Sequence, residues 1–200
     1  CLLDKRHMTQ DITTTTTNDA SSTEDVRSPR FGRTFLTVIS ILMFAMLISS
    51  IFIATSYEKG DGLSAYEREA IAVVSMQNEI TDGWNGMVDT FNTASVTSVD
   101  DHVVLYTLSQ ETARALISDS QAVINRWQAI DVPEGHTVSH GLGLDALRTT
   151  QDGLILFDEF FQNAIDTLVA DQIRSDEASV KLAQAQELWT QAAAAAASEG

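Results

Sequence analysis

The sequence predicts an all-α protein in which a single transmembrane helix is followed by an antiparallel up-and-down four-helix bundle. Three observations lead to this fold class. Residues 34–57 form an uncharged, mostly apolar run, and four later segments repeat apolar side chains at spacings of three and four, as one face of a helix does. No segment shows the period-two alternation that is typical of a strand. Short connections between amphipathic helices favour a bundle whose successive helices run in opposite directions.

The net charge of −16 is distributed unevenly along the 200 residues. Residues 1–33 carry five basic and five acidic side chains, whereas the residues after the apolar run carry 7 basic and 23 acidic ones. Arg27, Arg30 and Arg33 precede the run closely, so the positive-inside tendency predicts a cytoplasmic N-terminus and an extracytoplasmic bundle. Such an acidic domain offers no basic face for phosphates, and nucleic acid is therefore not an expected partner.

The segments before the bundle are predicted to tether it to a cell membrane in a single pass. Residues 1–33 are poor in large apolar side chains and are predicted to form a disordered, Thr/Ser-rich cytoplasmic tail. A helix over residues 34–57, at about 1.5 Å per residue, is long enough to cross the roughly 30 Å hydrocarbon core of a lipid bilayer. Residues 58–63 form a short polar linker with two glycines. Met8 is a plausible start, and a lipidated Cys1 is the alternative.

The first helix of the bundle is expected from Ser64 to about Ala94. Ser64 with Glu67 three residues later has the pattern of a capping box, which begins a helix. Gly83 and Gly86 weaken the middle of the helix and indicate close packing or a local bend. The apolar stripe of this helix consists of Val73, Met76, Ile80, Trp84, Met87 and Phe91.

Two further helices are expected on either side of a break at Pro133. Ser98 with Asp101 resembles a second N-cap, and this helix runs to about Ile130. Pro133 and Glu134 then suit the first turn of the third helix. The second stripe consists of Leu105, Leu108, Thr112, Leu116, Val123, Trp127 and Ile130. The third consists of Leu147, Leu154, Phe157, Phe161, Ala164 and Leu168.

The last helix is expected to begin near Ser175 and to end among six consecutive alanines, residues 192–197. The bundle thus occupies residues 64–197, and residues 198–200 are expected to form a frayed C-terminus. The expected anchors of the core are Trp84, Trp127, Trp189, Phe91, Phe157 and Phe161.

The best candidate for a metal site is a pair of histidines. His136 and His140 are four residues apart, so on a helix they share one face, as two metal ligands do. Glu134 and Asp145 are close enough in sequence to add ligands. A solvated helix start without a metal is the alternative interpretation. Gly135, Gly141 and Gly143 in the same run argue against a rigid helical platform for two metal ligands.

The remaining polar residues do not point to catalysis. Asp152, Asp158 and Glu159 lie in the third helix without the Glu-x-x-His pairs of di-iron bundles, and we expect them to face solvent. The sequence contains no Gly-x-Ser-x-Gly elbow, no glycine-rich phosphate loop and no nucleophile with a recognisable base. We therefore predict no catalytic residue, no enzyme activity and no bound cofactor.

The layout of residues 27–173 resembles the front half of bacterial chemoreceptors and sensor kinases, in which a short tail and one span precede an external four-helix bundle. Two stretches, WQAIDVPEGHTVSHGLGLDAL and FDEFFQNAIDTLVADQ, are also similar in texture to uncharacterised helical domains of bacterial lipoproteins and membrane-anchored proteins. The resemblance implies a structural or protein-interaction component of the cell envelope, acting with a protein partner or as a homo-oligomer. It leaves open a ligand- or metal-sensing module that acts through a partner.

Overall fold

The computed structural model describes residues 64–199. The predicted tail at 1–33, the predicted transmembrane helix at 34–57, the linker at 58–63 and residue 200 lie outside the described residues. None of the helices within residues 64–199 combines the length and the apolar character needed to cross a membrane.

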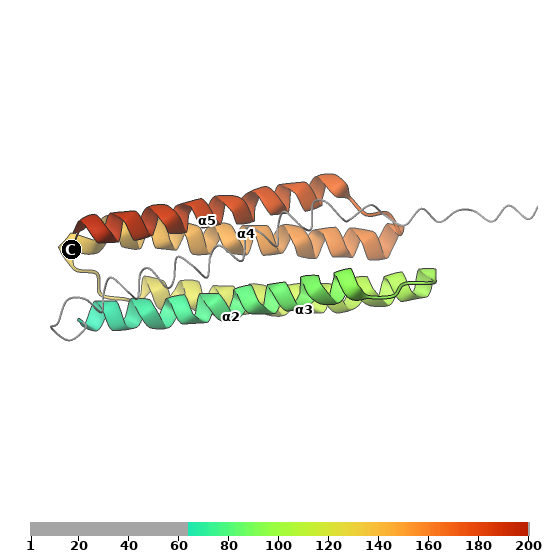
Figure 1. Ribbon diagram of the computed structural model, residues 1–200, viewed down its shortest axis with the longest axis horizontal. Coiled ribbons are helices and arrows are strands. Elements are labelled where there is room, and N and C mark those ends of the chain that lie inside the picture. Colours follow the sequence, from blue (N-terminus) through green and yellow to red (C-terminus); the bar gives the residue numbers. More distant parts are fainter. Residues whose placement is uncertain (1–63, 200) are drawn as a thin grey trace, which may run out of the picture.

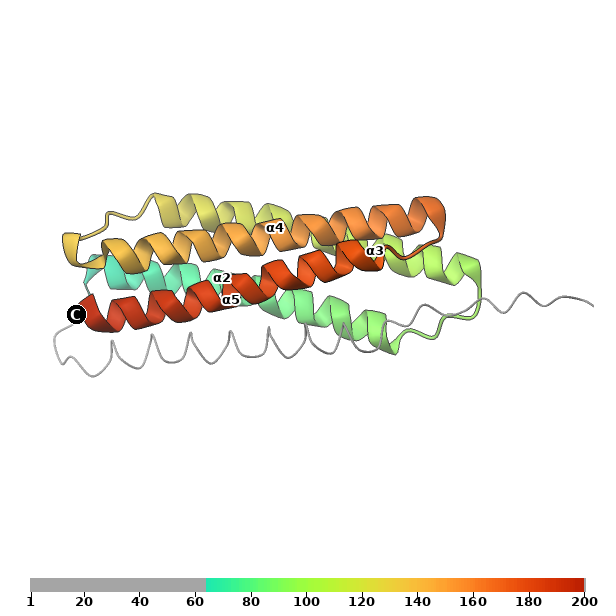
Figure 2. The ribbon, with the colours of Figure 1, turned by 90° about the horizontal axis from the view of Figure 1, so that it is seen from above.

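Residues 64–199 form four long α-helices and one short 3-10 helix, without a strand among them. The helices run back and forth along one axis and pack as a bundle (Figure 1). Seen from above, the α4–α5 and α2–α3 connections lie at the same end of the bundle (Figure 2). The all-α class and the bundle are thus confirmed. The elements are α2 (Ala65–Thr93), α3 (Val99–Gln128), η1 (Glu134–His136), α4 (Thr137–Thr167) and α5 (Gln172–Glu199).

The predicted capping box at Ser64 and the predicted N-cap at Ser98 both begin their helices, and the second is also a capping box. At α2, the backbone N–H of Glu67 donates to the Ser64 hydroxyl at 3.1 Å, and the Ser64 N–H donates to the Glu67 carboxylate at 2.7 Å. At α3, Ser98 and Asp101 exchange the corresponding bonds at 3.1 and 2.9 Å. Each box satisfies backbone donors that a helix start otherwise leaves without an intrahelical partner.

An aromatic core holds the helices together along the bundle axis. Trp84 of α2 contacts Phe157 of α4 with ring centroids 4.4 Å apart, and Trp127 of α3 meets Trp189 of α5 edge-on at 6.0 Å. These contacts cross the bundle diagonally, so all four helices share one core. Of the expected anchors, Phe91 and Trp189 are partly buried, and the others are buried.

Small residues let neighbouring helices approach each other closely. A Cβ atom added at Gly83 of α2 would lie 2.9 Å from the side chain of Leu116 on α3. One added at Gly153 of α4 would lie 2.8 Å from Leu182 on α5. The close packing expected around Gly83 is therefore present, whereas a Cβ at Gly86 would meet open space.

The structure corrects the predicted stripes at Leu108 and Leu168. Leu108 is 54% exposed, because α3 turns Ser109, Gln110 and Ala113 inward at this level instead. Leu168 is 58% exposed, since α4 ends at Thr167 and the next residue turns out of the helix. Leu168 belongs to the α4–α5 connection, and Leu108 is the tenth residue of α3.

Two expectations about helix ends and continuity also change. α5 begins at Gln172, three residues before the expected Ser175, and it includes Ser198 and Glu199 of the stretch expected to fray. α4 is continuous from Thr137 through Gly141 and Gly143, so the glycines do not prevent a helix there. At Gly143 the missing side chain lets α4 pack closely against the indole ring of Trp127, as described below.

Candidate functional site

The two predicted metal-ligating histidines lie at the end of the bundle where α2 begins and α5 ends. His136 closes η1 and stacks on Tyr66 of α2, with ring centroids 4.8 Å apart. His140, one turn along α4, stacks almost parallel on Trp127 of α3 at 4.7 Å, and its ring centroid is 6.0 Å from that of Tyr66. We call the group Tyr66, Trp127, His136, His140 and Glu199 the histidine end.

Glu199 joins the last turn of α5 to the first turn of α4. The backbone N–H of Val138 donates to Glu199 Oε1 at 3.1 Å, and Glu199 Oε2 is 4.0 Å from His136 Nδ1. A carboxylate is favoured at this place, because the first N–H groups of a helix lack intrahelical partners and carry partial positive charge. The Ser139 hydroxyl and these N–H groups hold the pKa of Glu199 below its usual value.

Trp127 fixes the position of His140 through the backbone. Its indole Nε1–H donates to the backbone oxygen of His140 at 2.9 Å. A Cβ atom at Gly143 would lie only 2.6 Å from the indole ring, so a glycine is needed for α4 to approach Trp127 this closely. In the sequence this contact is indicated only by Gly143, and a glycine within a helical pattern is normally interpreted as a weak point of the helix.

Burial changes the acid–base properties of the group. It lowers the pKa of His140 and raises that of Tyr66. His140 Nδ1 and Glu199 Oε2 are both buried without a hydrogen-bond partner. Buried polar atoms without a partner are uncommon, and two of the five found among residues 64–199 belong to the histidine end, which makes it a candidate site.

The described residues do not bring the candidate metal ligands together as a set. Nowhere in residues 64–199 are three or more His, Cys, Asp or Glu side chains grouped so as to hold a metal ion. His136 and His140 occupy one end of the bundle but stack on different aromatic rings, Tyr66 and Trp127. Metal binding by this pair stays a prediction.

A surface depression of about 240 Å³ lies beside Tyr66, between the start of α2 and the end of α3. This volume is below the range of roughly 300–1,000 Å³ that is usual for sites of drug-sized ligands. The Arg126–Glu69 ion pair, with N–O distance 3.0 Å, joins two of its lining residues. The depression therefore suits a small group rather than an extended ligand.

The carboxylates of α4 are engaged in links between helices. Asp158 accepts a bond from Arg114 of α3 at 2.8 Å, Glu159 pairs with Arg174 of α5, and Asp152 lies 3.8 Å from Lys181 of α5. Surface pairs of this kind contribute up to about 1 kcal/mol each. Their arrangement favours a role in holding α4 against its neighbours over a role in acid–base chemistry.

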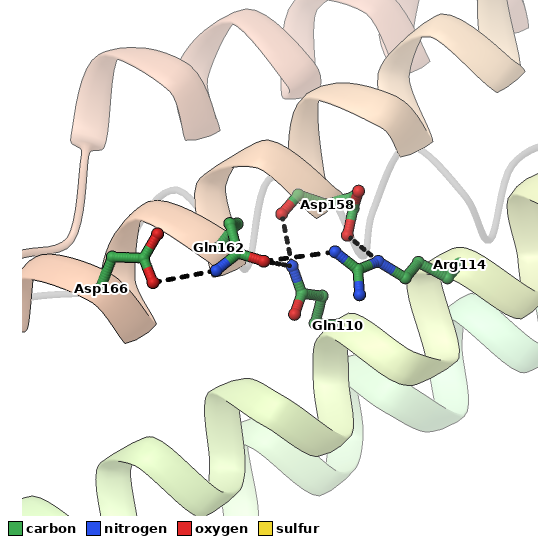
Figure 3. A network of polar contacts seen from close by, with 5 residues as sticks. All are labelled: Gln110, Arg114, Asp158, Gln162 and Asp166. Carbon is green, nitrogen blue, oxygen red and sulfur yellow. Dashed lines mark hydrogen bonds and ion pairs between the residues drawn. The ribbon is translucent and has the colours of Figure 1, made fainter.

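Figure 3 shows how the Asp158 contact extends into a network between α3 and α4. Gln110 donates to the Gln162 side-chain oxygen at 3.0 Å and to the Asp158 backbone oxygen at 3.4 Å. Gln162 also accepts from Arg114 at 3.3 Å and donates to Asp166 at 3.0 Å. These bonds fix the register of the two antiparallel helices. They also explain how a polar side chain, Gln110, can be buried on the inward face of α3.

The opposite end of the bundle carries a feature that sequence reasoning missed. Large apolar side chains are exposed in the α4–α5 connection, at the start of α5 and along the first ten residues of α3: Val99, Val104, Leu108, Leu168, Val169 and Ile173. We call this group the apolar end. The run TLVADQI, residues 167–173, contains three of these side chains. The apolar stripe predicted for the third helix, however, placed Leu168 in the core.

Comparison with protein-family models, with curated proteins and with solved structures finds no match for this chain. The interpretation of function therefore depends on the residues and their geometry.

Proposed function

We propose that this chain is a membrane-anchored helical-bundle protein that acts as a structural or interaction component of a cell envelope. In this proposal residues 34–57 hold it in the lipid bilayer, its N-terminus is cytoplasmic, and the bundle is extracytoplasmic and docks on another protein. It has no catalytic role and does not bind nucleic acid, in keeping with its net charge of −16.

The observation that carries the proposal is the apolar end. Apolar side chains scattered singly over a surface need no explanation, but exposed ones gathered in one region mark a place of interaction. Here Leu168, Val169 and Ile173 are 58, 63 and 73% exposed within six residues of chain. Among residues 64–199 the aromatic core already joins the four helices without these side chains.

Mild detergent extraction of the full chain from its native membranes, followed by purification, tests the proposal. We expect the chain in the membrane fraction and a second protein to accompany it in a fixed ratio. Protease added to intact cells whose outer barrier is opened should digest the bundle and spare the N-terminal tail. Recovery of the chain only as an isolated monomer, or a bundle protected from protease, would contradict the proposal.

A second candidate function is a ligand- or metal-sensing module acting through a partner. It is favoured by the buried atoms His140 Nδ1 and Glu199 Oε2, which have no hydrogen-bond partner. A ligand that binds only the folded protein raises the melting temperature. Zinc, copper or nickel should therefore raise Tm in wild type and not in His136→Ala with His140→Ala. An unchanged Tm across metals and small molecules excludes this candidate.

A further inference from the structure

The turn between α4 and α5 holds a residue whose conformation and exposure are both unfavourable. Leu168 has φ 57° and ψ 23°, in the left-handed region, and among residues 64–199 it is the only non-glycine residue with positive φ. Helices often end with such a residue, but it is usually glycine, because a Cβ atom makes this conformation costly. The leucine side chain gains little burial in return, since it is 58% exposed.

The neighbours of Leu168 extend the exposed apolar surface. Val169 is 63% exposed in the same turn, and Ile173 is 73% exposed in the first turn of α5. Two hydrogen bonds hold the backbone of the turn: the Leu168 N–H donates to the Ala164 oxygen at 3.0 Å, and the Val169 N–H donates to the Thr167 hydroxyl at 3.2 Å. The apolar side chains are therefore presented to solvent by a fixed backbone.

Acidic residues flank this turn in the sequence on both sides. Asp166, Asp171, Asp176 and Glu177 fall within residues 166–180, where Arg174 is the single basic residue. The Arg174 guanidinium already pairs with Glu159. At the same end of the bundle, residues 89–108 carry Asp89, Asp100 and Asp101 and no Lys or Arg. The turn thus carries apolar side chains, and the segments that meet at this end of the bundle carry a net negative charge.

We propose that the α4–α5 turn, with Leu168, Val169 and Ile173 at its centre, is the docking site for a basic protein segment that carries apolar side chains between Lys or Arg residues. The inference rests on the proposed interaction function and names the partner's chemistry. Apolar side chains of the partner cover the turn, and its cations meet the surrounding carboxylates.

The charge distribution argues against two other occupants. A second copy of this chain would bring the same carboxylates against each other, and like charges across an interface oppose association. An anionic lipid surface would be repelled in the same way. A basic partner alone meets both the apolar centre and the acidic surroundings.

The test uses the full chain in nanodiscs of zwitterionic lipid and a fluorescent helical peptide made of leucine and lysine as the probe. Anisotropy reports binding, and empty nanodiscs give the background. Matched peptides replace lysine by glutamate or leucine by serine. The protein variants are Leu168→Ser, Ile173→Ser and Leu168→Gly, with Val180→Ser as control, because Val180 is 67% exposed but lies further along α5.

We expect the Leu/Lys peptide to bind wild type and Val180→Ser equally and to bind Leu168→Ser and Ile173→Ser at least about tenfold more weakly. The glutamate and serine peptides should not bind, and added salt should weaken binding. Leu168→Gly separates docking from folding, since it should keep or raise Tm while weakening binding as Leu168→Ser does.

Several results would overturn the inference. These are equal binding by wild type and Leu168→Ser, stronger binding of the glutamate peptide, or dimerisation of the full chain that Leu168→Ser abolishes. Binding to anionic vesicles that depends on Leu168 would assign the turn to lipid instead. If the partner found by extraction still accompanies Leu168→Ser, the proposed function stands and this docking site fails.

Discussion

The two ends of the bundle differ in how far the side chains around their chain connections are covered. At the histidine end, stacked rings and the Glu199 carboxylate cover much of a chain connection and a helix start, and Val138 is the large apolar side chain left 62% exposed there. At the apolar end, Leu168, Val169 and Ile173 stay in solvent around a turn that glycine would form with less strain. The difference indicates that the second end carries features that folding alone does not require.

The largest difference between the ends is expected for truncation of an aromatic side chain. Trp127→Ala removes a side chain that is 3% exposed, together with its stack on His140 and its contact with Trp189. We expect a loss of about 3–5 kcal/mol in the free energy of unfolding. Leu168→Ala at the other end should change it by no more than about 0.5 kcal/mol. Chemical denaturation of both variants measures the two values, and comparable losses would remove the contrast.

Gly143 provides a sharper test of packing at the histidine end. In Gly143→Ala the new Cβ would lie 2.6 Å from the Trp127 ring, so the indole or the helix must shift. We expect a loss of about 1–3 kcal/mol, despite the better helix propensity of alanine. Gly141→Ala is the matched control, because its Cβ would meet open space; it should gain up to about 1 kcal/mol. The same sign of change in both denaturation curves would mean that the indole does not constrain Gly143.

Sequence periodicity predicted the helices well, because apolar spacing and capping boxes are local signals. Ser64–Glu67 and Ser98–Asp101 begin α2 and α3 as their patterns indicate. Periodicity failed at Leu108, where α3 turns Ser109, Gln110 and Ala113 inward instead, and at Leu168, where the stripe was extended beyond the end of α4. It also could not place Glu199 beside His136, since the two residues are 63 positions apart in the sequence and come together only in the folded bundle.

The pH dependence of stability is expected to come from the histidine end at mildly acidic pH. Burial lowers the pKa of His140 below its ordinary value of 6.5, so the unfolded chain binds this proton at a higher pH than the folded one. Stability should therefore fall as pH decreases from about 7.5 through this region. Glu199 and Asp101, whose pKa values are lowered, lose their stabilising contribution only as pH falls through the more acidic range of carboxylates.

His140→Phe tests this assignment, because phenylalanine keeps a flat ring over Trp127 and cannot be protonated. Denaturation between about pH 7.5 and 5.5 should show a smaller slope of stability with pH for the variant than for wild type. An unchanged slope would place the titration elsewhere.

The smallest expected effect lies at the apolar end and has the opposite sign. In Leu168→Gly the turn keeps its left-handed conformation but loses the Cβ atom, which makes that conformation cost about 1–2 kcal/mol in a non-glycine residue. Glycine also adds about 0.4–1 kcal/mol of backbone freedom to the unfolded chain, which opposes this gain. The balance favours a gain of about 0.5–1 kcal/mol and a rise of a few degrees in Tm. Leu168→Ala keeps the Cβ atom and should show no such gain. If Leu168→Gly is destabilised instead, the leucine side chain is packing against the bundle, and the contrast between the two ends is smaller than its exposure suggests.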